Sequence, residues 1–233
     1  MAEKRKDPDD GIAGVVNGSL YPDLLRDGGL ASAMRRLASR GRWDLGRIET
    51  DVGPARFVSA TMSSDRGRIA ILLGAEKRFF SIRISHLGHV WASGATDDLA
   101  AVTGVADAWR KGATLDELVH RFPFMHTNAL ALAFERGDPI PTQWDELLGH
   151  PELVHVRPLL NAAHSDERLR ALFPYVSHGT LRLYRDVRDT SLGELRLVPL
   201  PSGGFRVEAT WNDSTGEADS LPEAVRLARS FLP

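Results

Sequence analysis

The chain has 233 residues, of which 42% are hydrophobic and 26% are charged, a mixture typical of a soluble globular protein. Its formal net charge of -2 excludes a general electrostatic attraction to nucleic acid or to an anionic membrane surface. The absence of cysteine excludes disulfides, thiolate nucleophiles and cysteine-ligated metal centres, and it favours a cytoplasmic location.

The first half of the sequence predicts a helix and then a group of strands. Residues 1–20 begin with a charged segment that lacks the apolar run of a secretory signal, and they predict a flexible tail. Leu30, Met34 and Leu37 follow helical spacing, and Gly41 is a suitable helix end. A second helix begins after Asp97. Between the two helices, extended runs cover residues 55–63, 67–74, 78–85 and 89–93.

Helical periodicity replaces the strand pattern between residues 113 and 175. Thr114 and Glu117 have the spacing of a capping box. Pro158 should break or kink the helical pattern around it, because proline has no backbone N–H to donate. Other helices are expected over residues 127–135, from Thr142 onward, and over 165–173 with Ser165 as the cap.

The C-terminal part returns to strands and ends with a helix. Ser220 and Glu223 have capping-box spacing at the start of that helix. Alternating apolar and charged residues predict strands over 180–186, 193–200 and 204–211, with a hairpin turn at 201–204.

The two strand regions suggest a repeated unit. Residues 93–109 align without gaps over residues 215–231, which pairs Gly94 with Gly216 and Leu99 with Leu221. We therefore predict an α+β fold with two small antiparallel sheet units, each of a helix, three or four strands and a helix, joined by a helical middle segment. A degenerate duplication is one explanation of the alignment, and convergence of strand–helix ends is the other.

The same patterns predict how the chain is divided, with one continuous domain as the alternative. The predicted parts are a flexible tail at 1–20, an N-terminal sheet-helix unit at 21–112, a helical segment at 113–175, and a C-terminal unit of three strands and a helix at 176–233.

Asp97 and Asp98 stand at the start of the helix that ends the first unit. Their carboxylates suit helix capping, because they can accept hydrogen bonds from the free N–H groups of the first turn. The same negative charges oppose a phosphate site at that position. An acid/base pair of carboxylates would need a third partner, which the sequence does not indicate.

The densest polar group in the sequence contains His164, Arg168, Arg170 and His178. Either histidine could act as a general acid/base, and a nearby arginine could clamp a carboxylate or phosphate. The favoured alternative is structural: His164 caps a helix end, and the arginines pair with neighbouring carboxylates on the surface.

Arg182, Arg196 and Arg206 occupy the polar phase of the three C-terminal strands. If these strands pair, the arginines share one face of the sheet, where they would attract an acidic peptide or a phosphopantetheine-bearing partner. The favoured alternative is a solvated face, offset by Glu194 and Glu208.

The remaining motifs carry no catalytic or metal signature. Trp211, beside two polar residues at a strand end, is the tryptophan expected to be exposed for binding. His86 and His89 share a turn but lack the third ligand that a metal site needs. No nucleophile elbow, dinucleotide fingerprint or P-loop occurs, so no metal and no cofactor are expected. Each half has the topology of a double-stranded RNA-binding domain, but no lysine cluster precedes the last helix.

Three segments, "WASGATDDLAAVTGVADAWRKGATLDELVHRFPFM", "RPLLNAAHSDERLRALFPYVSHGTLRLYRD" and "GGFRVEATWNDSTGEADSLPEAVRLARSFLP", point to a family. Over residues 20–233 the chain resembles an actinobacterial domain-of-unknown-function family, number 6193, whose members are commonly labelled natural product biosynthesis proteins. The resemblance implies a biosynthetic context and no reaction or catalytic residue. The family pattern runs through a Cys and Tyr-Pro after "LRLYRD", where this chain has "VRDTSLGE", so any role of that cysteine is absent here.

Three functions are compatible with these observations. The favoured one is an accessory protein of bacterial natural product biosynthesis that binds a precursor peptide, a carrier protein or a biosynthetic enzyme. The second is a small cofactor-independent enzyme with His164 or His178 as acid/base and Arg168 or Arg182 as anion clamp. The third is an immunity or self-resistance protein. No apolar run approaches the roughly 20 residues of a membrane span, so neither membrane nor nucleic acid is an expected partner.

Overall fold

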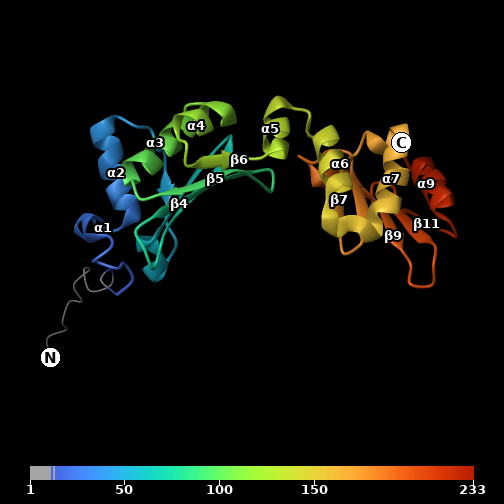
Figure 1. Ribbon diagram of the computed structural model, residues 1–233, viewed down its shortest axis with the longest axis horizontal. Helices are drawn as coiled ribbons and strands as arrows, with labels where there is room; N and C mark the ends of the chain where they lie inside the picture. The colour runs from blue at the N-terminus through green and yellow to red at the C-terminus, as the bar shows by residue number, and fades with distance from the viewer. Residues whose placement is uncertain (1–11, 13) are drawn as a thin grey trace. The chain divides into compact units, whose positions relative to one another are not determined.

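The computed structural model describes residue 12 and residues 14–233. The chain divides into two compact units, Met1–Glu135 and Arg136–Pro233, and each is described by itself. Both combine helices with an antiparallel sheet, which confirms the predicted α+β class (Figure 1). The division falls inside the segment 113–175 that was predicted as a helical connection. The tail predicted at 1–20 lies mostly outside the described residues, and in its described part Ile12 and Val16 are buried.

The first unit contains a six-stranded meander, counted over the described residues, in the order β1-β2-β3-β4-β5-β6. Its helical elements are α1 (Pro22–Asp27), α2 (Leu30–Gly41), the 3-10 helix η2 (Gly53–Phe57), α3 (Leu99–Arg110), α4 (Leu115–Arg121) and α5 (Ala129–Arg136). Its strands are β1 (Ile48–Glu49), β2 (Ser59–Ser64), β3 (Gly67–Leu73), β4 (Phe80–His86), β5 (His89–Thr96) and β6 (Met125–Thr127).

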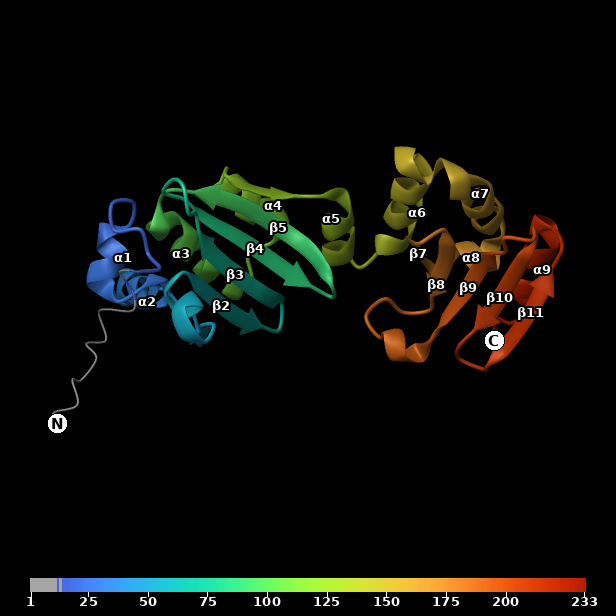
Figure 2. The same ribbon diagram turned by 90° about the horizontal axis from the view of Figure 1, so that it is seen from below.

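One face of this sheet forms the core of the first unit. Ile69 pairs with Ile84, and Ile71 pairs with Ile82, across β3 and β4, and all four side chains are buried. The helices α2 and α3 lie against this face (Figures 1 and 2). Trp109 of α3 is fully buried and contributes to the core. The alternate residues of the same strands point to the opposite face, because side chains alternate along a strand.

The predicted start signals of two helices in the first unit are confirmed. The Asp98 carboxylate accepts a hydrogen bond of 2.7 Å from the backbone N–H of Ala100 and caps α3. Thr114 and Glu117 form the expected capping box of α4. The apolar stripe of α3 is buried along its whole length, as its periodicity predicts.

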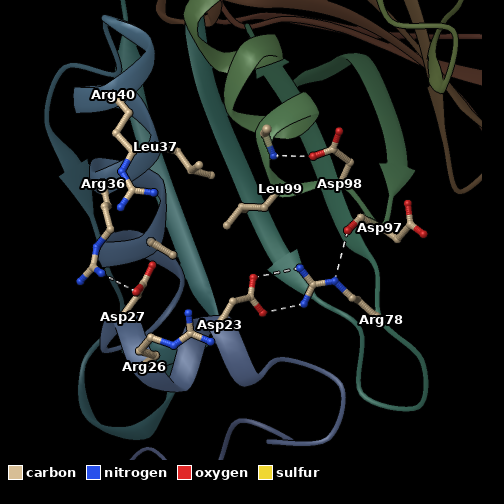
Figure 3. Close-up of a pocket in the computed structure, with 12 residues that line it drawn as sticks. Asp23, Arg26, Asp27, Arg36, Leu37, Arg40, Arg78, Asp97, Asp98 and Leu99 are labelled. Atoms are coloured by element: carbon tan, nitrogen blue, oxygen red, sulfur yellow. Dashed lines mark hydrogen bonds and ion pairs between the residues drawn. The ribbon is translucent and has the colours of Figure 1, made fainter.

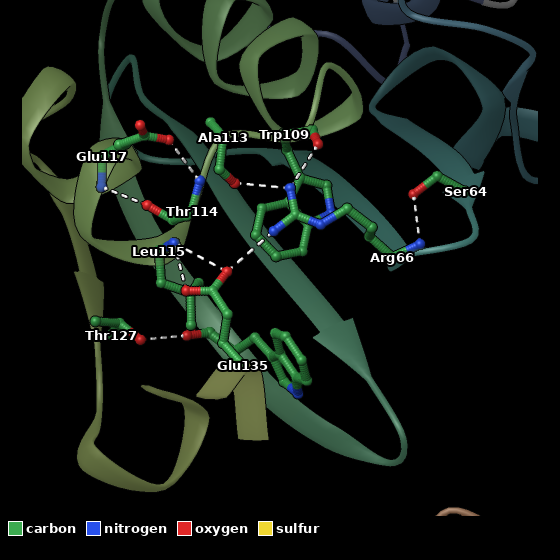
Figure 4. Close-up of polar contacts among 10 residues, drawn as sticks. Ser64, Arg66, Trp109, Ala113, Thr114, Leu115, Glu117, Thr127 and Glu135 are labelled. Atoms are coloured by element: carbon green, nitrogen blue, oxygen red, sulfur yellow. Dashed lines mark hydrogen bonds and ion pairs between the residues drawn. The ribbon is translucent and has the colours of Figure 1, made fainter. Parts of the chain in front are cut away.

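Arg66, in the turn between β2 and β3, joins parts of the first unit that are far apart in the sequence (Figure 4). Its guanidinium lies 3.8 Å from the ring centroid of Trp109 and donates hydrogen bonds to the carbonyls of Trp109 and Ala113, at 3.1 and 2.7 Å. It also pairs with the Glu135 carboxylate at 3.0 Å. That carboxylate accepts a hydrogen bond from the N–H of Leu115 at the start of α4, so one cluster holds the β2–β3 turn, α3, α4 and α5 together.

The second unit contains a five-stranded meander in the order β11-β10-β9-β8-β7. Its helical elements are α6 (Pro139–Gly149), the 3-10 helix η3 (Pro151–Val156), α7 (Arg157–Ser165), α8 (Glu167–Arg170), the 3-10 helix η4 (Thr190–Leu192) and α9 (Leu221–Ser230). Its strands are β7 (Phe173–Ser177), β8 (Thr180–Tyr184), β9 (Glu194–Pro199), β10 (Phe205–Ala209) and β11 (Ser214–Ala218).

Helices cover one face of the second sheet. The helices α6, α7 and α9 lie beside this sheet (Figure 2). The covered face contributes apolar side chains from β8, β9 and β10, which form a single core with these helices. These core side chains are Leu181, Leu183, Leu195, Leu197 and Val207. None of the helices described in either unit is both long and apolar enough to cross a membrane.

Several local predictions in the second unit need correction. The helix expected from Thr142 begins earlier, at Pro139. The break expected at Pro158 occurs because α7 begins at Arg157, which places the proline in the first turn, where a missing N–H loses no helical bond. Asp166, not Ser165, caps α8 by accepting hydrogen bonds from two backbone N–H groups.

The final helix also lacks the predicted reciprocal cap. The Ser220 side chain makes no capping bond, and Glu223 accepts a hydrogen bond of 3.2 Å from the N–H of Asp219. In both units a strand leads directly into a helix, β5 into α3 and β11 into α9, and the aligned residues Leu99 and Leu221 are the first residues of those helices. This common order agrees with a duplication, which stays a prediction.

Candidate functional site

A cavity of about 480 Å³ lies in the second unit beside α6, α7 and α8. Small-molecule and side-chain pockets have volumes of about 300–1,000 Å³, so this cavity is large enough to hold a ligand. We call it the His164 pocket, and its lining residues are Asp138, Ile140, Pro141, Trp144, Asp145, His164, Glu167, Arg170 and Ala171.

Trp144 and His164 form the aromatic part of this pocket. Trp144 is fully buried, and its indole N–H donates to the carbonyls of Arg170 and Leu172, at 3.0 and 3.2 Å. The imidazole of His164, in the last turn of α7, lies with its centroid 5.2 Å from the Trp144 ring. The hydrogen bonds hold the buried indole in one orientation, and the half-buried imidazole of His164 that packs on it is the exposed aromatic group of the pocket.

Charged side chains surround the aromatic part. Asp138, Asp145, Glu167 and Arg170 are all exposed residues of the pocket lining. Within the described part of the chain, none of these side chains forms a hydrogen bond or an ion pair. Because the three carboxylates outnumber the single guanidinium, the potential at the rim favours a positively charged ligand group.

The structure does not bring His178 or Arg168 into this pocket. His178 lies in the turn between β7 and β8, with φ of 51°, and its Nδ1 atom is 3.0 Å from the hydroxyl oxygen of Ser177. Arg168 donates a hydrogen bond to the carbonyl of Pro233 at 2.9 Å. Of the four polar residues grouped by the sequence, only His164 and Arg170 line the pocket.

Arg182, Arg196 and Arg206 do share one face of the second sheet. Arg182 on β8 and Arg196 on β9 are direct cross-strand partners. Arg196 also lies opposite Glu208 on β10. Arg206 is two residues before Glu208 on that strand, so it points to the same face. Each arginine has a carboxylate partner. The ion pairs are Arg182–Glu194 at 3.6 Å, Arg196–Glu194, Arg196–Glu208 at 3.7 Å and Arg206–Glu208 at 3.3 Å.

At one end of this face, Arg182 belongs to a polar cluster with Tyr184 and Glu194. Burial raises the pKa of the Tyr184 phenol, and a hydrogen bond with Tyr184 raises the pKa of Arg182. Glu194 is only 6% exposed, so its negative charge is held among these groups. The glutamates therefore offset most of the attraction that this face would have for an acidic partner.

Trp211 is less available for binding than its sequence position suggests. Its indole N–H donates to the carbonyl of Phe231 at 3.0 Å, and its side chain is partly buried against the core of the second unit. The guanidinium of Arg185 lies 5.9 Å from its ring centroid. Trp211 therefore connects the end of β10 to the end of α9.

His86 and His89 are cross-strand partners in the hairpin between β4 and β5. The ring of His86 packs against Trp91 at 5.1 Å, and the ring of His89 packs against Phe134 at 5.0 Å. Burial lowers the pKa of His89, which favours the neutral imidazole. Among the described residues, no group of three or more histidine, aspartate or glutamate side chains is arranged to hold a metal ion.

A charged cleft of about 350 Å³ in the first unit was not predicted from the sequence (Figure 3). Arg78 pairs with both carboxylate oxygens of Asp23, at 2.8 and 3.0 Å, and hydrogen bonding to Arg78 lowers the pKa of Asp23. Arg36 pairs with Asp27 at 2.9 Å. These pairs connect α1 to α2 and to the loop before β4, so we assign them a structural role.

The sequence carried a partial signal for the His164 pocket. Its polar members could be noticed as a cluster between residues 164 and 170. Trp144 gave no signal of its own, because its contact with His164 requires α6 to fold back beside α7. Asp138 and Asp145 lie on the same helix as Trp144 or at its start, and the sequence analysis did not consider them as site residues.

Comparison with known proteins identifies a family similarity in the second unit. The sequence model of a family described as a family of unknown function, DUF6193, matches residues 138–233. No curated protein and no solved structure matches the chain. The matched segment contains every lining residue of the His164 pocket and the arginine-bearing sheet face.

Proposed function

We propose that the protein is a non-catalytic accessory protein of bacterial natural product biosynthesis that binds a precursor peptide. The observation that carries the proposal is the His164 pocket, an open cavity with the His164 ring in its wall and a mainly acidic rim that is unpaired within the described part of the chain. Such a pocket suits a lysine or arginine side chain of the peptide. The apolar stem would contact Ile140 and Pro141, and the charged end would meet the carboxylates.

The exposure of the rim supports binding over catalysis. Asp138, Asp145, Glu167 and Arg170 are all open to solvent, so water competes for each of them. Proton transfer and charge stabilisation are most effective in sites that exclude water. Recognition of a side chain tolerates a solvated rim, and polar rims are usual at protein interfaces. A carrier protein or a biosynthetic enzyme is the alternative partner.

The biosynthetic context rests on sequence similarity. The resemblance of residues 20–233 to proteins labelled as natural product biosynthesis proteins supports it, and the match of residues 138–233 to DUF6193 agrees with that family. The family description assigns no function, so the partner must be identified directly.

Substituting His164 with alanine is expected to weaken binding of the peptide by up to about tenfold, because a lost aromatic contact contributes about 0.5–1.5 kcal/mol. The measurement begins with gentle isolation of the tagged protein from a lysate that contains the products of neighbouring genes, followed by native mass spectrometry. The captured peptide is then titrated against the wild-type protein and the variants. His178→Ala is the control, because His178 lies outside the pocket. Equal affinity of the wild-type protein and His164→Ala would contradict the proposal.

A second candidate function is supported because His164 and Arg170 line one cavity. In that function, His164 is the acid/base of a cofactor-independent enzyme, and Arg170 replaces Arg168 and Arg182 as the anion clamp. His164→Ala would then reduce product formation in the producing strain by about 10²–10⁴-fold, while His178→Ala would leave it unchanged. Full product formation by the His164→Ala strain would remove this candidate.

A further inference from the structure

The uncovered face of the first sheet carries a continuous row of side chains across its strands. The cross-strand partners Thr61, Ala70, Arg83, Ser93 and His126 come from β2, β3, β4, β5 and β6 in turn. Direct partners in an antiparallel sheet point to the same face, so these side chains are neighbours. The buried isoleucines of β3 and β4 occupy the opposite face, which α2 and α3 cover.

Two adjoining hollows lie along this face. One, of about 360 Å³, is lined by Ala70, Leu72, Ser81, Ile82, Arg83, Ser93, Gly94 and His126, and we call it the Arg83 hollow. The other, of about 370 Å³, shares Ala70, Leu72 and Arg83 and continues toward β2. Leu72 is 53% exposed, so an apolar side chain lies beside Arg83 on the open face. The surface therefore combines polar and apolar side chains, and it extends over several strands.

The polar groups of the Arg83 hollow have no partner within the described part of the chain. The side chains of Ser81, Arg83, Ser93 and His126 form no hydrogen bond or ion pair there. The neighbouring Arg68 makes only a 3.3 Å hydrogen bond to the Thr61 hydroxyl. The open face of the second sheet is different, because all three of its arginines are paired with glutamates. An anion from a partner molecule would therefore compete with fewer carboxylates of the chain itself for an arginine on the first sheet than on the second.

Two carboxylates, those of Glu49 and Asp51, lie toward the β1 and β2 side of this surface. Glu49 shares the row but is on β1, three strand spacings from Arg83, or about 14 Å at the usual strand separation. Asp51 lines only the second hollow, and its carboxylate accepts a hydrogen bond of 2.7 Å from the Ser59 hydroxyl. Among the described residues, no carboxylate lines the Arg83 hollow itself. Its positive charge therefore comes from Arg83.

We propose that the Arg83 hollow is the docking site for an acidic linear segment of a partner polypeptide. A carboxylate of that segment pairs with the Arg83 guanidinium, and the hydroxyls of Ser81 and Ser93 and the imidazole of His126 supply further hydrogen bonds. An adjacent apolar side chain of the partner covers Leu72. A nucleic acid fits less well, because the whole molecule has a net charge of -2 and Glu49 faces the same side. The site shares no residue with the His164 pocket, so the two proposals are independent.

The test uses the full chain and a fluorescein-labelled hexaglutamate peptide, with binding measured by fluorescence anisotropy at low ionic strength. We expect hexaglutamate to bind and an equally long hexaglutamine peptide not to bind. Arg83→Glu should weaken binding at least about tenfold, because it removes a charge-assisted hydrogen bond and adds repulsion. Arg83→Gln should show a smaller loss in the same direction. Added salt should weaken the wild-type complex.

Arg226→Glu is the matched control, because Arg226 is an exposed arginine of α9 without a partner among the described residues. It should bind hexaglutamate as the wild-type protein does. Circular dichroism of each variant checks that the fold is retained. Equal binding by Arg83→Glu and wild type, or equal binding of the two peptides, would overturn the proposal. If Arg206→Glu lost binding and Arg83→Glu did not, the binding site would lie on the second sheet and the proposal would be wrong. If an oligonucleotide bound in an Arg83-dependent way and hexaglutamate did not, the partner would not be an acidic peptide.

Discussion

Replacing Trp144 with alanine is expected to lower the free energy of unfolding of the second unit by about 4 kcal/mol. The indole is fully buried in the core of that unit. The substitution leaves a cavity and also removes the N–H donor from the carbonyls of Arg170 and Leu172, which lie just before β7. The loss should therefore exceed that of a purely apolar truncation of similar size.

Urea denaturation followed by circular dichroism measures the loss for Trp144→Ala, and hydrogen exchange shows which part of the chain opens. Exchange should accelerate in α6, α7 and β7, while β3 and β4 of the first unit keep their protection. Trp144→Phe is the matched variant, because it keeps an aromatic ring but no N–H donor, and its loss should be intermediate. A Trp144→Ala protein as stable as wild type would show that the indole does not support this core.

Replacing Arg66 with alanine is expected to lower the free energy of unfolding of the first unit by about 3 kcal/mol, because hydrogen bonds to charged groups contribute about 1.5–3 kcal/mol each and partial exposure reduces the total. The guanidinium supports two backbone carbonyls, the Glu135 carboxylate and the face of Trp109 (Figure 4). Its side chain is 30% exposed, and that of Glu135 is 20% exposed. Removing it leaves the Glu135 charge without its cation.

Chemical denaturation of Arg66→Ala, Arg66→Lys and Arg68→Ala separates the contribution of the Arg66 charge to stability from the contribution of its planar hydrogen-bonding geometry. Arg66→Lys keeps the charge but cannot reproduce the planar fork, so most of the loss should remain. Arg68 is exposed and makes a single long hydrogen bond, so Arg68→Ala should change stability by less than about 0.5 kcal/mol. If Arg66→Lys were fully stable, the geometry of the cluster would be unimportant. If Arg68→Ala lost as much as Arg66→Ala, the loss would not be specific to Arg66.

Most long helices and several strands could be predicted from local sequence. The stripe of α3, the capping box of α4 and the alternation of Phe80, Ile82 and Ile84 in β4 each depend on residues a few positions apart. The short strands β6, β7 and β11 were not predicted. A strand such as Met125–Thr127 has too few residues for a periodic pattern, and it exists because β5 offers it a pairing edge.

The candidate sites were predictable only in part. His164 and Arg170 were recognised from their proximity in sequence, whereas Trp144 joins them through a fold-back of helices. The three arginines of the second sheet were expected to share a face, and the register places them there. From the sequence, neutralisation of these arginines by Glu194 and Glu208 was one of two alternatives, because the sequence does not specify which side chains lie opposite one another. The structure shows the ion pairs.

The α+β class, the main helices and strands, and the exclusion of cysteine chemistry could be read from the sequence, because they follow from composition, periodicity and capping over short distances. Which polar side chains are paired and which remain available depends on the tertiary fold. Arg66 meets Glu135 across 69 residues, and Arg83 meets Ser93 and His126 only through the register of three strands. Such contacts depend on how the chain folds back on itself, and local patterns carry no information about that.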